Sequence, residues 1–198
     1  EIVMTSSIPG ATMLVQWDGT SLFPIAQTQA QAPGLAPGVV FSGSGWGSTI
    51  AASGVLAFQG GVQGPGISTG NNRGLWFRDA SSTDLVVRRE DPVPGDPPGN
   101  VFNEMNRYPR VNAAGQVVWL DEIYLGSNLQ YRGLFEWTRA GGLQLVAREG
   151  TPAPGGGVFT RLQGYPELDE AGNVAFESRV DDGSGTPQEA LFVRWGGT

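Results

Sequence analysis

The sequence predicts an all-β protein, namely a β-propeller or a propeller-like array of four-stranded repeats of about 60 residues. Three short motifs support this class, because each of them recurs about every 60 residues along the chain. Such a period is typical of stacked supersecondary units that bury their apolar faces on one another. Apolar residues at helical spacing are hard to find, whereas short runs of Val, Leu, Phe and Trp between turn-forming residues favour strands.

The first motif is a Pro-Gly pair that follows an apolar pair and a polar stretch. It occurs at Pro33-Gly34, Pro94-Gly95 and Pro154-Gly155, so that successive glycines lie 61 and 60 residues apart. Proline presets φ at about −65° and glycine accepts the positive φ that follows, which suits the centre of a type II turn. We therefore expect these three segments to be loops.

The second motif is a tight turn that leads into an apolar strand, and it spans residues 51–58, 112–119 and 169–176. An Asn or Asp at its start can cap the backbone, and a Gly three residues later can adopt the left-handed conformation of a hairpin turn. Ala51 replaces the Asn or Asp in the first copy, so a weaker turn is expected there.

The third motif is an aromatic-rich strand at residues 74–78, 133–137 and 190–194. In the first two of these copies another apolar strand follows after a few polar or glycine residues, at residues 84–88 and 143–147. We expect four strands in each full copy and, with the incomplete ends, about fourteen strands in the chain.

These units divide one domain, residues 1–198, into about three and a half repeats. The predicted parts are a partial repeat at 1–26, repeats at 27–88 and 89–148, and a partial repeat at 149–198. Partial units leave unpaired sheet edges, which invite pairing with another chain. We therefore expect a protein partner or self-association, with a two-fold dimer that completes one propeller as a specific hypothesis.

The three motifs resemble the NxxGxxAF tandem-repeat family of bacterial secreted and surface-anchored proteins. Residues 112–119 keep the Asn and Gly but end in Val118-Trp119, and residues 169–176 have Asp for Asn but keep Ala175-Phe176. The resemblance covers nearly the whole chain and implies propeller-like repeats and an extracellular, cell-surface or periplasmic location in a bacterium. It implies no reaction and no catalytic residue. The chain starts at Glu1 without an apolar leader, so we expect a mature, trimmed or excerpted product.

Composition excludes several classes of function. The net charge is −7, with twelve arginines and neither lysine nor histidine, so the chain lacks the basic stripe of a nucleic-acid site. The absence of cysteine excludes disulfides and thiolate catalysis and is compatible with export. No apolar run is long enough to span a bilayer.

The residue inventory also argues against an enzyme. Without His, Cys and Lys the chain cannot form a Ser-His-Asp triad, a Ser-Lys dyad or a His-bound zinc site. A carboxylate pair for glycoside hydrolysis would have to be brought together by the fold. The candidates for such a pair are Glu104, Asp121, Glu122, Glu136, Glu167 and Glu177. We expect no catalytic residue.

The acidic segment Asp181–Gly185 is a weak candidate for calcium, an ion that needs only oxygen ligands. It lacks the alternating D-x-D-x-D-G spacing of a calcium loop, so a solvated hairpin loop is the favoured interpretation. We predict no cofactor and no metal-binding residue.

The six tryptophans offer an alternative function, because a flat indole ring can stack on the apolar face of a sugar. Five lie in or beside predicted strands, where packing between sheets is the favoured role; they are Trp17, Trp76, Trp119, Trp137 and Trp195. Trp46 lies in a glycine-rich loop outside the motifs and is the single candidate for a ligand contact.

Together these observations favour a non-catalytic, exported structural module that acts as a scaffold or peripheral subunit of a bacterial envelope or extracellular assembly. The alternative is an extracellular carbohydrate-binding module that uses Trp46 and the loops at residues 63–72 and 181–188.

Overall fold

The computed structural model describes residues 2–8, 11–43, 47–104 and 108–196, with side chains described from residue 12 onward. Within these ranges the chain forms sixteen β-strands and no helix, which confirms the all-β prediction. The strands are β1 (Ile2–Ile8), β2 (Ala11–Trp17), β3 (Leu22–Gln27), β4 (Val40–Phe41), β5 (Ser48–Ile50), β6 (Leu56–Gln63), β7 (Arg73–Arg78), β8 (Thr83–Arg88), β9 (Asn100–Phe102), β10 (Arg110–Val111), β11 (Val117–Leu125), β12 (Asn128–Thr138), β13 (Gly142–Arg148), β14 (Val158–Leu168), β15 (Val174–Asp181) and β16 (Gln188–Arg194).

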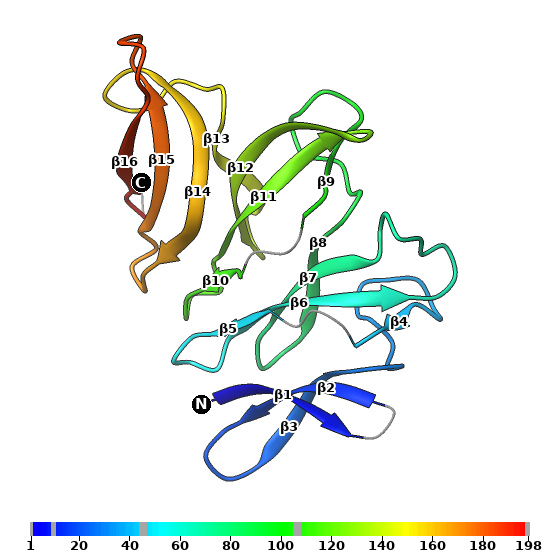
Figure 1. Cartoon of the computed structure of the whole chain (residues 1–198). Coiled ribbons are helices and arrows are strands. Elements are labelled where there is room, and N and C mark those ends of the chain that lie inside the picture. Colours follow the sequence, from blue (N-terminus) through cyan, green and yellow to red (C-terminus); the bar gives the residue numbers. More distant parts are fainter. Residues whose placement is uncertain (1, 9–10, 44–46, 105–107, 197–198) are drawn as a thin grey trace.

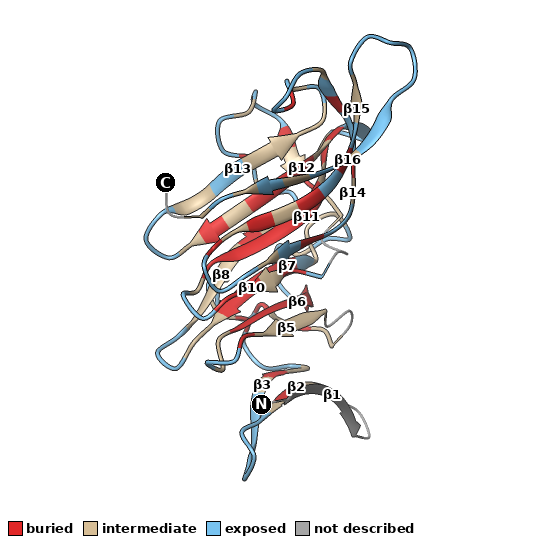
Figure 2. Cartoon of the chain, turned by 90° about the vertical axis from the view of Figure 1, so that its left-hand side faces the viewer, coloured by how far each residue is buried: buried red, intermediate tan, exposed pale blue. Residues whose placement is uncertain are grey.

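The strands form four antiparallel sheets that follow one another in chain order (Figure 1). The first sheet is β1-β2-β3 and the fourth is β14-β15-β16. The second sheet contains β4 to β8 and the third contains β9 to β13. Buried residues concentrate where neighbouring sheets face each other, in strands such as β6 and β11 (Figure 2).

The strand count exceeds the expected fourteen because, in the second and in the third sheet, two short strands take the position of one strand and pair with the same long strand. β4 and β5 both pair with β6, and β9 and β10 both pair with β11. In the fourth sheet the corresponding place is taken by β14 alone, whose register shifts between Gln163 and Glu167. Four strands were expected in each full repeat, but no motif assigned residues to this place, and no residue pattern marks where the pairing is interrupted.

The tight turns form as their residues predict. Gly54, Gly115 and Gly172 have φ values of 83°, 82° and 85°, the left-handed conformation that favours glycine. The Asn112 carboxamide accepts a hydrogen bond from Gln116 N at 3.1 Å, and the Asp169 carboxylate accepts one from Asn173 N at 2.8 Å. The first turn keeps the backbone hydrogen bond from Ala51 N to Val55 O, but alanine supplies no side-chain acceptor.

Three of the four sheets carry a triad of aromatic rings on the face toward the preceding sheet. The three rings of a triad come from three neighbouring strands. The triads are Phe41–Phe58–Trp76, Phe102–Trp119–Phe135 and Phe159–Phe176–Phe192. In each triad the second and third rings are stacked at 5.5–5.8 Å between centroids, and the first and third are edge-on at 4.8–5.0 Å. These geometries are the favourable ones for aromatic pairs, worth about 0.5–1.5 kcal/mol each beyond burial.

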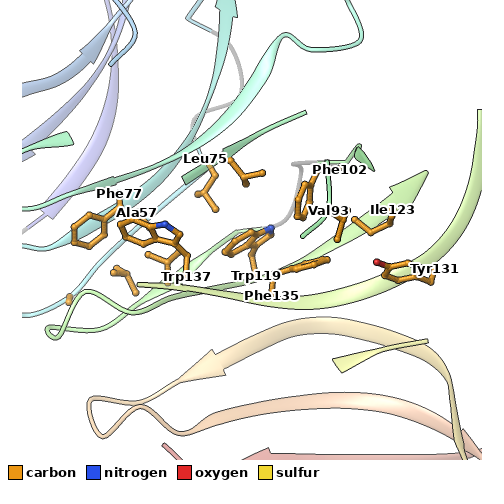
Figure 3. Packing of buried hydrophobic residues seen from close by; sticks show 14 residues of the cluster. Ala57, Leu75, Phe77, Val93, Phe102, Trp119, Ile123, Tyr131, Phe135 and Trp137 are labelled. Carbon is orange, nitrogen blue, oxygen red and sulfur yellow. The ribbon is translucent and has the colours of Figure 1, made fainter. Parts of the chain in front are cut away.

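Each triad packs against aliphatic side chains of the preceding sheet, so that three hydrophobic cores lie between four sheets. Figure 3 shows the core between the second and third sheets, where Leu75 lies opposite Trp119, and Ala57 lies near Trp137. The core between the first and second sheets includes Leu14, and the core between the third and fourth includes Leu134. Each internal sheet therefore presents its aromatic triad to the preceding sheet and mainly aliphatic side chains to the next.

A β-bulge fixes one leucine in each of the first three sheets. The strand pairing shifts between Leu14 and Val15, between Leu75 and Trp76, and between Leu134 and Phe135. These leucines are at most 1% exposed, because each points into the core shared with the next sheet. In the fourth sheet Leu191 directly precedes the triad member Phe192 and thus holds the same place.

Near the tight turns, one side chain of each of the first three sheets contacts the next sheet in chain order. We call this contact the junction. In the first junction Gln16 Nε2 donates to Gly54 O at 3.5 Å. The second is a pair of aromatic rings, Phe77 and Trp137, with centroids 5.2 Å apart. The third is the ion pair between Glu136 and Arg194. The three junctions therefore differ in chemistry although they lie in the same place.

Ion pairs also cross between sheets on their outer surfaces. Arg139 of the third sheet bonds Asp79 and Asp84 of the second sheet at 2.6 Å each. Hydrogen bonding from Arg139 holds the pKa of Asp79 well below its usual range. Between the third and fourth sheets, Arg110 contacts Glu167 at 3.0 Å and lowers the pKa of that carboxyl.

Candidate interaction surface

The outer edge of β16 differs from the corresponding edges in the other sheets. β2, β7 and β12 each pair on both sides, the second partner being β3, β8 or β13. β16 pairs only with β15 among the strands that the structure describes. The backbone N–H and C=O groups along its free side therefore form a template for another strand.

A cleft of about 360 Å³ lies beside this edge. Its floor is the aromatic triad of the fourth sheet, and its walls are the end of β13 and the loop that contains the third Pro-Gly turn. The lining residues are Val146, Ala147, Thr151, Pro152, Pro154, Phe159, Phe176, Phe192, Val193 and Arg194. Only Thr151 and Arg194 bring polar side chains, so the cleft is mainly apolar.

In the second sheet the corresponding place is filled by Leu85 of β8. Leu85 lies opposite Trp76 in the strand register and packs so closely on Gly34 that a Cβ atom on that glycine would lie 2.8 Å from the leucine Cβ. Trp76 is fully buried, and its Nε1 donates to Pro33 O at 3.0 Å. Phe192, which holds the place of Trp76, is only half-buried because no described strand covers it.

The face of the fourth sheet that points away from the third exposes aliphatic side chains. Leu191 is 69% exposed and Val193 is 43% exposed, in contrast to the buried leucines of the other three sheets. Polar groups surround them, including Glu177 opposite Leu191 and the ion pair of Arg179 with Glu189 at 3.1 Å. An exposed apolar group with a polar rim is typical of an interaction site.

The third junction holds the fourth sheet in place beneath this surface. Glu136 is bonded by Arg194 and accepts a hydrogen bond from Gln116 Nε2 at 2.9 Å. Asn112 is buried in the same region, and its Nδ2 donates to Asp169 O at 3.1 Å. This network links the third sheet to the fourth.

The carboxylates considered for glycoside hydrolysis lie in different parts of the molecule. Asp121 is buried and accepts hydrogen bonds from the N–H groups of Glu104 and Glu122. The Glu122 side chain pairs with Arg132 at 2.7 Å. Glu136 and Glu167 are held by the arginines described above, and Glu177 lies on the exposed face of the fourth sheet.

The acidic loop at residues 181–185 forms short turns that use its own carboxylates. Asp181 accepts a hydrogen bond from Gly183 N, and Asp182 accepts one from Ser184 N, at 2.9 Å each. Hydrogen bonds from Ser184 lower the pKa of Asp182. Among the described residues no group of three or more His, Cys, Asp or Glu side chains could hold a metal ion.

The tryptophans separate into two groups. Trp76 and Trp119 are fully buried and Trp137 nearly so, as packing between sheets requires. Trp17 and Trp195 are exposed, because they lie on the terminal sheets. Trp46 lies outside the described residues.

An exposed aromatic pair lies beside Gly47. Tyr108 and Tyr165 are both about half exposed, and their rings meet edge-on with centroids 6.0 Å apart. Gly47 touches this pair, since a Cβ atom on it would lie 3.2 Å from the Tyr108 ring. The sequence motifs did not indicate these tyrosines, which lie outside all three of them.

The fold and surface together define an all-β protein of serially packed antiparallel sheets with an apolar cleft beside the edge of β16. No helix in the described part of the chain has the length and apolar character needed to cross a membrane. Residues 8–198 match the model of a family described as "Family of unknown function (DUF7453)", and the chain belongs to that family. Neither the curated proteins nor the solved structures gave a match.

Proposed function

We propose that this protein is a non-catalytic structural module whose fourth sheet binds another protein. The observation that carries the proposal is the contrast between buried and exposed leucines at one place in four sheets. Three of these leucines stabilise contacts between sheets, and Leu191 presents the same apolar group to solvent. Burying one exposed leucine side chain contributes roughly 1.5–3 kcal/mol, which favours a protein contact there.

In this proposal the four sheets are successive blades of a propeller-like array built from repeats of about 60 residues. The recurring triads and bulges support it, since each sheet offers an aromatic face to the preceding sheet and an aliphatic face to the next. The resemblance to the NxxGxxAF family supports export, with the module acting as a scaffold or peripheral subunit of a bacterial envelope or extracellular assembly.

A second copy is one partner that suits the exposed face. On the first sheet Trp17 and Leu22 lie directly opposite each other and are both exposed. Trp17 holds the place that Trp137 holds in the second junction, and Val193 holds the place of Phe77. A head-to-tail contact would therefore bring Val193 of one copy against Trp17 of the other, which is consistent with a dimer that completes a ring.

Sedimentation of the full chain over a range of concentrations tests the second copy as the partner. We expect a dimer that dissociates on dilution and that Val193→Glu abolishes. A strict monomer at about 100 μM would exclude the second copy, because a biological interface of standard size holds well below that concentration.

Carbohydrate binding is the second candidate function, and the exposed pair of Tyr108 and Tyr165 beside Gly47 favours it. Aromatic rings at a solvent-exposed site can stack on sugars, and Trp46 immediately precedes Gly47. A glycan array with the wild type, Trp46→Ala and Tyr165→Ala tests this function. Binding that both variants lose would establish a glycan site, and an array without hits would exclude it for the glycans displayed.

A further inference from the structure

We propose that the exposed tyrosine pair belongs to a strip along β5, β10 and β14 that binds an uncharged glycan and excludes acidic sugars. This inference rests on the proposed carbohydrate-binding function and specifies the class of ligand. The strip has an aromatic row and a polar row side by side. The aromatic row is Gly47, Tyr108 and Tyr165, and the polar row is Thr49, Arg110 and Glu167.

Three equivalent segments build the strip, and each leads directly into one of the tight turns. They are residues 47–51, 108–112 and 165–169. The segments contain β5, β10 and the end of β14, and β10 contacts both of the other strands (Figure 1). Their first residues touch along the row. A Cβ atom on Gly47 would lie 3.2 Å from the Tyr108 ring, and the Tyr108 and Tyr165 rings meet with centroids 6.0 Å apart.

The third residue of each segment forms the polar row. Side chains two residues apart in an extended segment point to the same face, so this row runs beside the aromatic one. Thr49 Oγ1 donates to Pro109 O at 2.7 Å. Arg110 Nε and Nη2 donate to the Glu167 carboxylate at 3.1 and 3.0 Å. Both contacts link one segment to the next.

Tyr108 is 50% exposed although the third sheet has a neighbouring sheet on each side. Gly47 adjoins it from the second sheet and Tyr165 from the fourth. A glycine at the place of a tyrosine leaves space beside the Tyr108 ring, which a side chain there would crowd. Both tyrosines precede a buried proline, which restricts their backbone to extended conformations. The opening is therefore a property of three consecutive sheets.

The two rows match the two sides of a sugar ring. The C–H face of a sugar can stack on the tyrosine rings, whose bodies are apolar and whose hydroxyl groups are polar. The sugar hydroxyls can donate to Glu167, whose side chain is 69% exposed and accepts hydrogen bonds only. Two rings in contact along the row suit consecutive sugar residues of one chain.

Charge along the strip disfavours acidic sugars. Arg110 is neutralised by its two hydrogen bonds to Glu167, and these bonds lower the pKa of that carboxyl, so it is ionised at neutral pH. Glu177 brings a second carboxylate near Tyr165, because a Cβ atom on the adjoining Gly164 would lie 3.6 Å from Glu177 Oε2. A uronate or sulfate group would therefore meet net negative charge and be repelled.

A glycan array that displays both neutral and acidic glycans tests the class of ligand with the full chain. We expect binding to neutral hexose chains and roughly fivefold or more weaker binding to uronate and sulfated chains. Equal or stronger binding of the acidic chains would overturn the inference and leave carbohydrate binding in place. An array without hits would remove both.

A matched pair of variants locates the site on the protein. Titration calorimetry uses the neutral oligosaccharide that binds most tightly on the array. Tyr165→Ala should weaken its binding roughly fivefold or more, because one stacking ring is lost. Phe23→Ala removes a ring of similar exposure, 45%, from the first sheet and should leave binding unchanged. Equal loss in the two variants, or loss in neither, would place the glycan elsewhere and refute the inference.

Glu167→Gln tests the exclusion of acidic sugars by a gain of binding. The amide carries no negative charge, so Arg110 becomes available to a ligand carboxylate. Trigalacturonate should bind this variant roughly threefold or more tightly than the wild type, the size expected for an exposed ion pair. Glu189→Gln is the control, because it frees Arg179 of the same sheet outside the strip and should give no gain. A gain in neither variant, or an equal gain in both, would contradict charge selection at Glu167.

Discussion

Replacing one leucine by alanine at the same place in two sheets should have very different effects on stability. Leu134 is fully buried between the third and fourth sheets, whereas Leu191 is 69% exposed. Leucine-to-alanine changes in cores cost about 2–5 kcal/mol, because they remove apolar contacts and leave a cavity. Surface changes usually alter the free energy of unfolding by about 0.5 kcal/mol or less.

Urea unfolding followed by tryptophan fluorescence measures both effects. With an m value of about 2–3 kcal/mol/M, a loss of about 3 kcal/mol lowers the midpoint for Leu134→Ala by about 1–1.5 M. The midpoint for Leu191→Ala should move by about 0.2 M at a low protein concentration. An equal shift in the two variants under those conditions would refute the view that the outer face of the fourth sheet is open.

Three further perturbations test other parts of the structure. Gly34→Ala should destabilise the chain by more than 1 kcal/mol in thermal unfolding, roughly the strain expected at a positive φ plus a clash with Leu85. Burial and its hydrogen bond to Asp96 raise the pKa of Tyr131, so its stabilising contribution is complete below about pH 10 and is lost as the pH rises further. Burial also raises the pKa of Tyr124, so alkaline titration of the folded chain at 295 nm should show delayed ionisation of both tyrosines. The pKa of Asp79 is lowered, so its contribution is present above about pH 4 and is lost as the pH falls, and Asp79→Asn should flatten the acid branch of the stability profile.

Each of these perturbations has a control. Gly183→Ala also places alanine at a positive φ of 87°, but no atom lies near the added Cβ, so it should cost less than Gly34→Ala. For the alkaline titration, Tyr131→Phe should remove the contribution of Tyr131 to the delayed ionisation and leave the other tyrosines in place. Added salt should weaken the contribution of Asp79 to stability, because its arginine partner is about half exposed and salt screens such ion pairs. If Asp79→Asn leaves the loss of stability at low pH unchanged, other groups are responsible for that loss.

The local parts of the fold could be predicted because single residues determine them. The left-handed glycines of the tight turns and the Pro-Gly loops follow from backbone sterics, and the strand segments follow from their apolar composition. The interrupted pairing of β6 and β11 could not be predicted, because the residues that separate the short strands carry no common pattern. The repeat alignment, the propeller and the location of the protein stay predictions.

The partial repeat at 149–198 predicted an unpaired sheet edge, but the side chains exposed there could not be identified from the sequence, for a physical reason. Leu191 and Phe192 belong to the same aromatic-rich motif as Leu75 and Trp76, so their sequence alone predicts burial. Their exposure depends on which strands surround them, and this is a property of the tertiary arrangement. In the same way, Trp17 and Trp195 were expected to pack between sheets but lie on terminal ones.

The three junctions bear on how the sheets find their correct neighbours during folding. Neighbouring units with similar cores are prone to mispairing, because a wrong partner offers nearly the same apolar contacts. If the fourth sheet docked on the second, the Arg194 guanidinium would meet the Phe77 ring and Glu136 would lose its cation. An unpaired buried charge is strongly unfavourable. The glutamine, aromatic and ionic contacts therefore favour the correct neighbouring sheet over similar ones and keep the sheets in chain order.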